Sequence, residues 1–300
     1  MNCLKEGNLN SLNNLVDDIY KTLEPLCDGE SIDISDDLID ELSENIKSVF
    51  KQWKNVPERN KNFTLRMSNV GRPSRQLWYE SKTGASGGGN IQPSTFIKFM
   101  YGHILEEVLL FLVKIAGHDV SDCQKEVKVK GISGHMDCKI DGEVVDIKTA
   151  SGRAFQKFSN GTLPEDDPFG YIAQLSGYEE AEGTSNGGFL VINKETGELS
   201  FFQPEELDKI NIGSRIDSLL SSLSSDTPPD RCYDPTPDGK SGNMKLNKGC
   251  TYCAYKFDCY SDSNDGKGLR VFDYAKGPVY MTEVKSLPRV SEITNEFKSV

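Results

Sequence analysis

Two aspartates and a lysine lie close together within residues 134–150, whose sequence is GHMDCKIDGEVVDIKTA. Asp137 precedes an Asp-Gly pair at 141–142, and Asp146 and Lys148 follow that pair. The pair stands among alternating β-branched residues, a pattern typical of a tight β-hairpin. Because alternate residues of a strand face the same way, Asp146 and Lys148 share one face of the second strand, and Asp137 can reach that face from the first. Two carboxylates on rigid strands can bind Mg²⁺ or Mn²⁺, and a nearby ammonium can orient or deprotonate water, so these residues predict metal-assisted phosphodiester hydrolysis.

Three further side chains on expected helices can join this site. Residues 101–110, YGHILEEVLL, predict the start of an apolar helix that carries Glu106. A carboxylate buried in so apolar a helix needs a partner such as a metal ion, and the neighbouring Glu107 is the alternative for this role. Gln174 and Tyr178 are four residues apart on another expected helix, so they share one face and can present both side chains to a scissile phosphate or the strand near it.

These motifs, in their order along the chain, resemble those of the PD-(D/E)xK nuclease superfamily. The sequence from Gly102 is similar to the first motif of RecB-like nucleases, G-x-x-x-(H/E)-E-x-L, with Glu106 at the metal-ligand position. Asp137 and the D-x-K of residues 146–148 correspond to the central motifs of the superfamily. Residues 174–178, QLSGY, match the Q-x-x-x-Y helix that follows the lysine motif in RecB-like and CRISPR-adaptation nucleases.

The resemblance implies a fold, an activity and a set of roles. The fold is a restriction-endonuclease-like α/β core, in which helices flank a mixed central sheet. The activity is that of a metal-dependent deoxyribonuclease, preferably an exonuclease, which hydrolyses linear double- or single-stranded DNA in phage or bacterial DNA processing, alongside recombination or replication proteins. One or two Mg²⁺ or Mn²⁺ ions would be bound by Glu106, Asp137, Asp146 and the backbone carbonyl of Ile147. Lys148 would position or activate the attacking water, and the substrate strand would be oriented by Gln174 and Tyr178.

Two other functions compete with this hypothesis. The first is a CRISPR-adaptation-type nuclease that trims DNA within a larger complex. The missing N-terminal cysteine and the long helical extension argue against this function. The second is a non-catalytic DNA-binding scaffold that keeps the fold. The intact acidic residues and lysine argue against a scaffold, since a decayed site tends to lose them.

Three cysteines form a C-x₂-C-x₅-C motif at Cys250, Cys253 and Cys259. Many RecB-like nucleases hold a 4Fe-4S cluster with three such cysteines and one from an N-terminal C-P-R-x-L-W-Y motif. This chain resembles that motif but has Pro73 at the cysteine position, which leaves Cys232 as the best replacement for a fourth ligand. Four thiolates suit either an iron-sulfur cluster or zinc. The resemblance favours the cluster, with zinc and three unliganded thiols as alternatives.

The net charge of −12 is unevenly distributed along the chain. Residues 61–160 carry 14 Lys and Arg against 10 Asp and Glu, and residues 240–300 carry 10 against 7. Residues 1–60 carry 6 against 13, and residues 161–239 carry 4 against 16. Contact with phosphate requires local positive charge rather than a basic total, so the acidic total does not exclude a DNA enzyme.

The hydrophobic pattern predicts three segments. They are an N-terminal helical extension (1–62), the nuclease core (63–225), and a cysteine-cluster module with tail (226–300). The expected elements are helices over 10–58, 96–116, 171–181 and 205–224, and strands near 124–132, 135–140, 143–149, 188–193 and 199–203. The sequence has neither a run of about twenty apolar residues nor the layout of a secretory signal, so we expect no membrane contact and a cytoplasmic location, in the bacterial host if the protein is phage-encoded.

Overall fold

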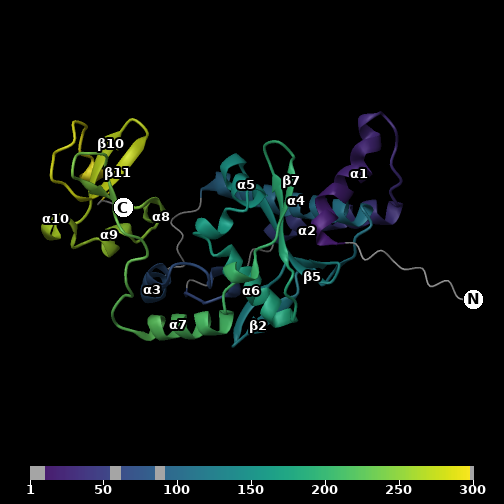
Figure 1. The fold of residues 1–300 in the computed structure, drawn as a ribbon, viewed down its shortest axis with the longest axis horizontal. Helices are drawn as coiled ribbons and strands as arrows, with labels where there is room; N and C mark the ends of the chain where they lie inside the picture. Colours follow the sequence, from purple (N-terminus) through teal and green to yellow (C-terminus); the bar gives the residue numbers. More distant parts are fainter. Residues whose placement is uncertain (1–10, 55–61, 85–91, 298–300) are drawn as a thin grey trace, which may run out of the picture. The chain divides into compact units, whose positions relative to one another are not determined.

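The computed structural model describes residues 11–54, 62–84 and 92–297, and Figure 1 draws the chain as a ribbon. The described residues form two compact units. The sheet unit contains residues 11–54, 65–71 and 92–217, and the cysteine unit contains residues 62–64, 72–84 and 218–297. This grouping differs from the three expected segments, because the N-terminal helices belong to the sheet unit and residues 72–84 belong to the cysteine unit.

The centre of the sheet unit is a five-stranded mixed sheet. Its strand order is β1-β4-β5-β6-β7, in which β5 and β6 are parallel and the other neighbours are antiparallel. The strands are β1 (Val120–Ser121), β4 (Cys138–Ile140), β5 (Glu143–Ala150), β6 (Gly188–Asn193) and β7 (Leu199–Phe202). Helices α5 (Gly152–Ser159) and α6 (Tyr171–Glu182) lie in the connection between the two parallel strands. The expected α/β class, a mixed sheet flanked by helices, is confirmed.

The hairpin between β4 and β5 forms at the Asp-Gly pair, as the sequence predicts. Asp141 and Gly142 have φ angles of 52° and 86°, the left-handed conformation that a type I′ turn requires at both central positions. The Asp141 carboxylate is fixed by the backbone N–H of Asp119 at 3.0 Å and by the ring of buried His118, whose Nδ1 is 2.6 Å away. The expected strands 124–132 and 135–140 differ from those of the structure, because β2 (Glu126–Val129) and β3 (Ile132–His135) pair in a separate ribbon and β4 begins only at Cys138. Asp137 therefore lies one residue before β4 rather than inside a strand.

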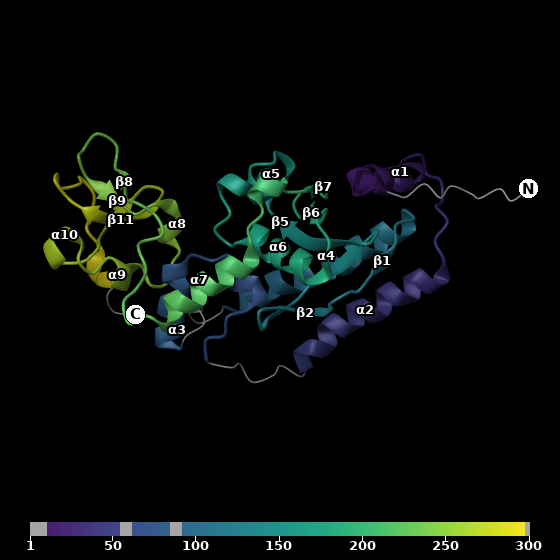
Figure 2. The ribbon, with the colours of Figure 1, turned by 60° about the horizontal axis from the view of Figure 1, so that its bottom comes forward.

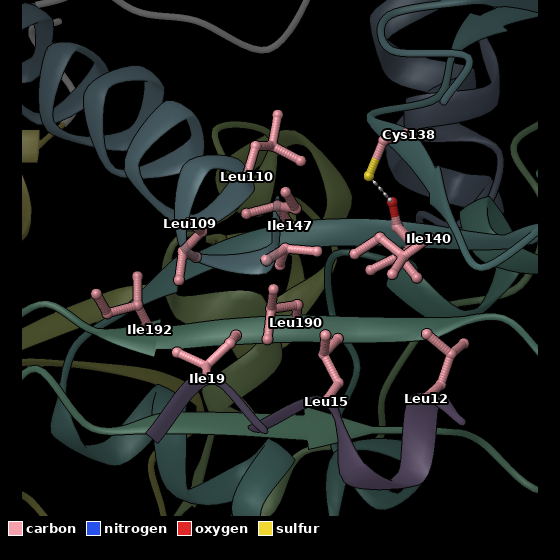
Figure 3. Packing of buried hydrophobic residues seen from close by; sticks show 12 residues of the cluster. Leu12, Leu15, Ile19, Leu109, Leu110, Cys138, Ile140, Ile147, Leu190 and Ile192 are labelled. Atoms are coloured by element: carbon pink, nitrogen blue, oxygen red, sulfur yellow. Dashed lines mark hydrogen bonds between the residues drawn. The ribbon is translucent and has the colours of Figure 1, made fainter. Parts of the chain in front are cut away.

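Alternation along β5 places Val145 and Ile147 on one face of the sheet and Asp146 and Lys148 on the other. Val145 and Ile147 join a hydrophobic core with residues of α1 (Leu15–Cys27) and α4 (Pro93–Ile115). Figure 3 shows Leu109 and Leu110 of α4 and Leu15 and Ile19 of α1 in this core. Asp146 and Lys148 lie on the opposite face, which packs against α6. The register of β5 thus excludes its charged residues from the apolar core.

The second N-terminal helix, α2 (Asp36–Lys54), packs against α4. The Nδ2 of Asn45 donates to Oε2 of Glu107 at 2.9 Å, and Lys114 forms an ion pair with Glu41. Both helices can be followed in Figure 2. Within the described residues, no helix is long and apolar enough to span a membrane.

The cysteine unit has a smaller core and mostly short elements. Its four-stranded sheet has the order β10-β11-β9-β8, with strands β8 (Thr236–Pro237), β9 (Met244–Lys245), β10 (Arg270–Tyr274) and β11 (Gly277–Glu283). Its helices are α3 (Ser74–Thr83), the end of α7 (Ile212–Ser224), α8 (Lys248–Thr251), α9 (Lys256–Cys259), α10 (Ser263–Gly266) and α11 (Thr294–Phe297). One hydrophobic cluster of this unit contains the buried residues Leu246, Tyr260, Leu269, Val271 and Tyr280, and Leu77, Tyr255, Phe272 and Met281 are buried in the unit too.

Candidate active site

Strand β5 places a carboxylate and an ammonium in direct contact. The Lys148 Nζ forms an ion pair with Oδ2 of Asp146, whose exposed fraction is only 1%. From α6, the Nε2 of Gln174 donates to the other oxygen of Asp146, Oδ1, at 3.5 Å. The structure therefore brings together three of the expected site residues, two from a strand and one from a helix.

Asp137 reaches the site from the position just before β4. The last residue of β4 paired with β5 at this end is Cys138, opposite Val145. Beyond it, the Asp137 carboxylate takes the place of a neighbouring strand, because its Oδ2 accepts the backbone N–H of Ile147 at 2.7 Å. In an extended strand the N–H and C=O of one residue point to the same edge, so the Ile147 carbonyl faces the edge that Asp137 occupies.

Helix α4 contributes Glu106, and the two adjacent glutamates have different partners. Glu106 Oε1 accepts from Nε2 of Gln124 at 2.9 Å, whereas Glu107 is bonded to Asn45 of α2. A cleft of about 340 Å³ between α2 and α4 is lined by both glutamates, Gln124 and Asp137. Gln124 is not among the predicted site residues, since a lone glutamine in a connecting loop gives no signal of its own in the sequence.

Burial and mutual repulsion perturb the carboxyl groups. Burial raises the pKa of Glu106 to about 7, and the charges of Glu107 and Asp146 act in the same direction. Burial raises the pKa of Asp137 to about 8, with further contributions from the charges of Asp146 and Glu106. Burial opposes the charged form of Lys148, but the negative charges of Asp146 and Asp137 outweigh it and raise the pKa of the ammonium. Crowded buried carboxylates of this kind favour a further positive charge among them.

Tyr178 lies behind Gln174 rather than at the surface. Its hydroxyl donates to the backbone carbonyl of His135 at 2.8 Å and accepts from Nε2 of Gln174 at 3.0 Å. The side chain is 1% exposed, and burial raises the pKa of the phenol to about 12. This position differs from the expected direct contact with the substrate strand. Tyr178 instead holds the Gln174 amide and strand β3 in place.

The four expected cysteine ligands come together in the cysteine unit. Cys232, Cys250, Cys253 and Cys259 line one cavity of about 30 Å³, and Pro73 lines it too. All four are free thiols. Arg75 Nε donates to the Cys259 Sγ at 3.1 Å. Burial raises the pKa of Cys250 to about 11 and also raises the pKa values of Cys232 and Cys253.

Both groups of residues have donors suited to metal ions, hard oxygens in the sheet unit and thiols in the cysteine unit. Among residues 11–54, 62–84 and 92–297, however, no three His, Cys, Asp or Glu side chains already converge as ligands of one ion. In the sheet unit, Lys148 forms an ion pair with Asp146 Oδ2, and the Ile147 N–H is bonded to Asp137 Oδ2. The donor types fit a divalent cation.

Comparison with known proteins gives no family assignment. No family model and no curated protein matches the chain. Among solved structures, the chain is similar to an alkaline exonuclease from Laribacter hongkongensis (TM-score 0.36, 13% identity, 59% of this chain and 92% of that chain covered). It is also similar to a phage-related exonuclease from Haemophilus somnus (TM-score 0.37, 13% identity, 53% and 93% covered) and to a protein named SSO0001 (TM-score 0.33, 19% identity, 61% and 85% covered). Likenesses at this level carry no functional argument, so the function has to be inferred from the site and its motifs.

Proposed function

We propose that this protein is a metal-dependent DNA nuclease, and specifically an exonuclease, that hydrolyses phosphodiester bonds. The observation that carries this proposal is the contact of Lys148 with buried Asp146, beside Asp137 and Glu106. Two of these three carboxyl groups have raised pKa values, partly because together they would place more negative charge in the site than one ammonium balances. Mg²⁺ or Mn²⁺ bound there would polarise the phosphate and stabilise the charge that develops on its oxygens.

Each residue has a role that follows from its position. Asp137, Asp146, Glu106 and the Ile147 carbonyl would hold the ion, since Asp137 accepts the Ile147 N–H and Asp146 directly precedes Ile147 in β5. Lys148 would hold the attacking water and counter negative charge at the phosphate. The Gln174 amide would orient Asp146 and the substrate strand, with Tyr178 as its support.

The substrate in this proposal is linear DNA, and the preference for ends rests on the resemblance stated above. Recombination or replication proteins are the partners that such an activity implies. In a CRISPR-adaptation-type nuclease the same site would trim DNA within a complex. A non-catalytic scaffold would bind DNA without cleaving it.

In the cysteine unit we propose an inorganic centre held by Cys232, Cys250, Cys253 and Cys259. The shared cavity supports this assignment. Pro73, at the position where the resembling motif has its cysteine, lines the same cavity as Cys232, so Cys232 can supply the missing thiolate. A 4Fe-4S cluster is preferred by resemblance, and a zinc ion is the alternative.

The experiment for the main proposal uses end-labelled linear DNA and closed circular DNA. The purified protein is incubated with each in Mg²⁺, in Mn²⁺ and in EDTA. Degradation of linear DNA alone, in either metal, supports the exonuclease, whereas cleavage of circular DNA indicates an endonuclease. Absence of metal-dependent cleavage of any DNA would overturn the nuclease and leave the scaffold.

A further inference from the structure

Two aromatic rings lead from the surface of the sheet unit to the catalytic lysine. Phe169 has 59% of its surface exposed, and its ring stacks on that of Tyr171, with centroids 5.5 Å apart and planes 24° from parallel. The Lys148 Nζ lies 5.0 Å from the centroid of the Tyr171 ring. Among the described residues, Phe169 has no other ring partner. It therefore offers an aromatic surface to solvent two residues from the ring that contacts Lys148.

The turn that presents Phe169 is held by its own hydrogen bonds. The carboxylate of Asp167 accepts the backbone N–H groups of Gly170, Tyr171 and Ile172 at 2.9, 3.0 and 2.9 Å, which caps the start of α6. Gly170 has a φ of 74°, and a Cβ at this position would lie 2.3 Å from the backbone of Gly71. The backbone on either side of Phe169 is thus fixed by a capping carboxylate and by a close approach that only glycine permits.

The Tyr171 ring packs against two further aromatic rings. Tyr171 lies 6.3 Å from Phe158 and 6.4 Å from Phe189, measured between ring centroids. A small cavity of about 80 Å³ beside these rings is lined by Lys148, Tyr171 and Phe169. Phe169 is held on a rigid turn next to the ring that contacts Lys148, and its exposed face is suited to a ligand with a flat apolar surface.

We propose that Phe169, supported by Tyr171, is a stacking platform for an unpaired nucleobase of the DNA being cleaved. This inference rests on the proposed nuclease function and defines its substrate class as DNA with a single-stranded or frayed end. A base inside a duplex is stacked on both sides and cannot reach such a ring without unpairing. Every base has a π-face, so the platform would hold the strand at Lys148 without selecting a sequence.

The experiment measures stacking directly and needs no cleavage. Single-stranded oligonucleotides carrying 2-aminopurine at the 5′ end or the 3′ end are titrated with protein in EDTA, next to a blunt duplex carrying 2-aminopurine at an internal pair. We expect fluorescence quenching with at least one single-stranded probe and none with the duplex. Phe169→Ala should weaken binding of the quenched probe by about ten- to a hundredfold.

Two further variants separate stacking from other effects. Phe169→Leu keeps an apolar side chain without a ring and should lose the quenching, whereas Phe169→Trp should keep it. Leu207→Ala is the matched control, since Leu207 is a 94% exposed apolar residue of the same unit and lies outside the site. Binding by Phe169→Ala or Phe169→Leu equal to that of the wild type would overturn the platform. Because the probes report binding without turnover, a protein that quenches them but never cleaves would overturn the nuclease and not the platform.

Discussion

The carboxylate site of the sheet unit and the cysteine cavity of the other unit are held in place by different means. Asp146 and Lys148 lie on an eight-residue strand, β5, that has a strand on each side and a hydrophobic core behind it. Cys250 and Cys259 lie on helices of only four residues each and pack against a small cluster of buried residues. The first arrangement can persist without a ligand, because folding of the sheet fixes it. The second has so little structure of its own that a metal centre would contribute much of its stability.

The largest expected effect concerns removal of the centre from the cysteine unit. Metal-thiolate binding contributes about 10 kcal/mol or more to the folding of small modules, so Cys250→Ser should unfold the cysteine unit and leave the sheet unit folded. Limited proteolysis followed by mass spectrometry maps the unfolded segment, and elemental analysis measures iron and zinc. Cys27→Ser is the control, because Cys27 is exposed in the sheet unit. A Cys250→Ser protein with wild-type protease resistance would contradict the proposed dependence.

Elemental analysis also tests Cys232 as the fourth ligand. Cys232→Ser should reduce the iron or zinc content well below that of the wild type. Unchanged metal content in this variant would exclude Cys232 from the centre, while about four irons per chain in the wild type would favour the cluster over one zinc ion.

The second effect concerns chemistry in the sheet unit. Asp146→Asn keeps the size of the side chain but removes its charge, and the loss of a bound ion that stabilises the transition state should cost several kcal/mol of barrier. Cleavage should fall by at least a thousandfold, measured as release of label from linear DNA, with the cysteine unit unchanged in its metal content. Wild-type cleavage by this variant would sink the assignment of Asp146.

The third effect concerns Lys148. Lys148→Ala should slow cleavage by on the order of a hundredfold, as for loss of a positioned electrostatic or acid-base group, while Mn²⁺ affinity remains close to that of the wild type. Calorimetry measures the Mn²⁺ affinity. Loss of Mn²⁺ binding in the variant would show that Lys148 supports the geometry of the site and has no role specific to the reaction.

The last expected effect is a pH dependence of stability in EDTA. Asp137 has a pKa of about 8 in the folded chain, above its ordinary value of 3.8, so the folded state keeps a proton that the unfolded state has lost. Stability from this group is present at pH 4 and is lost as the pH rises toward 8, by up to about 1.4 kcal/mol per pH unit. The melting temperature of the sheet unit should therefore fall between pH 5 and 8, and fall less in Asp137→Asn. Parallel curves of melting temperature against pH for the wild type and Asp137→Asn would contradict the raised pKa of Asp137.

The local elements of the site could be predicted from the sequence because local chemistry sets them. The turn at Asp141 and Gly142 and the strand Gly188–Asn193 follow from residue type and alternation within a few positions. The N-terminal helix α1 belongs to the central core through Leu15 and Ile19, which helical periodicity alone could not reveal. Periodicity identifies an apolar face but does not identify its partner.

Long-range packing also explains the features that the sequence left open. Strands β8 and β9 have two residues each and exist through pairing in the β10-β11 sheet, in a segment where the hydrophobic pattern predicts no strand. Whether Glu106 or its neighbour faces the aspartates depends on α2, since Asn45 takes up the carboxylate of Glu107. The burial of Tyr178 likewise depends on the ribbon that carries His135. Each of these contacts joins segments that are distant in the sequence, so the pattern within one segment does not predict it.

The most direct measurement of the central claim is Mn²⁺-dependent cleavage of end-labelled linear DNA by matched aspartate variants. Asp137→Asn replaces the carboxylate that accepts the Ile147 N–H at the site. Asp119→Asn makes the same replacement at an exposed residue of the same unit. A metal-dependent nuclease site predicts loss of cleavage across the whole Mn²⁺ titration in Asp137→Asn and wild-type rates in Asp119→Asn. Equal cleavage by the two variants, or equal rates in Mn²⁺ and in EDTA for the wild type, would contradict it.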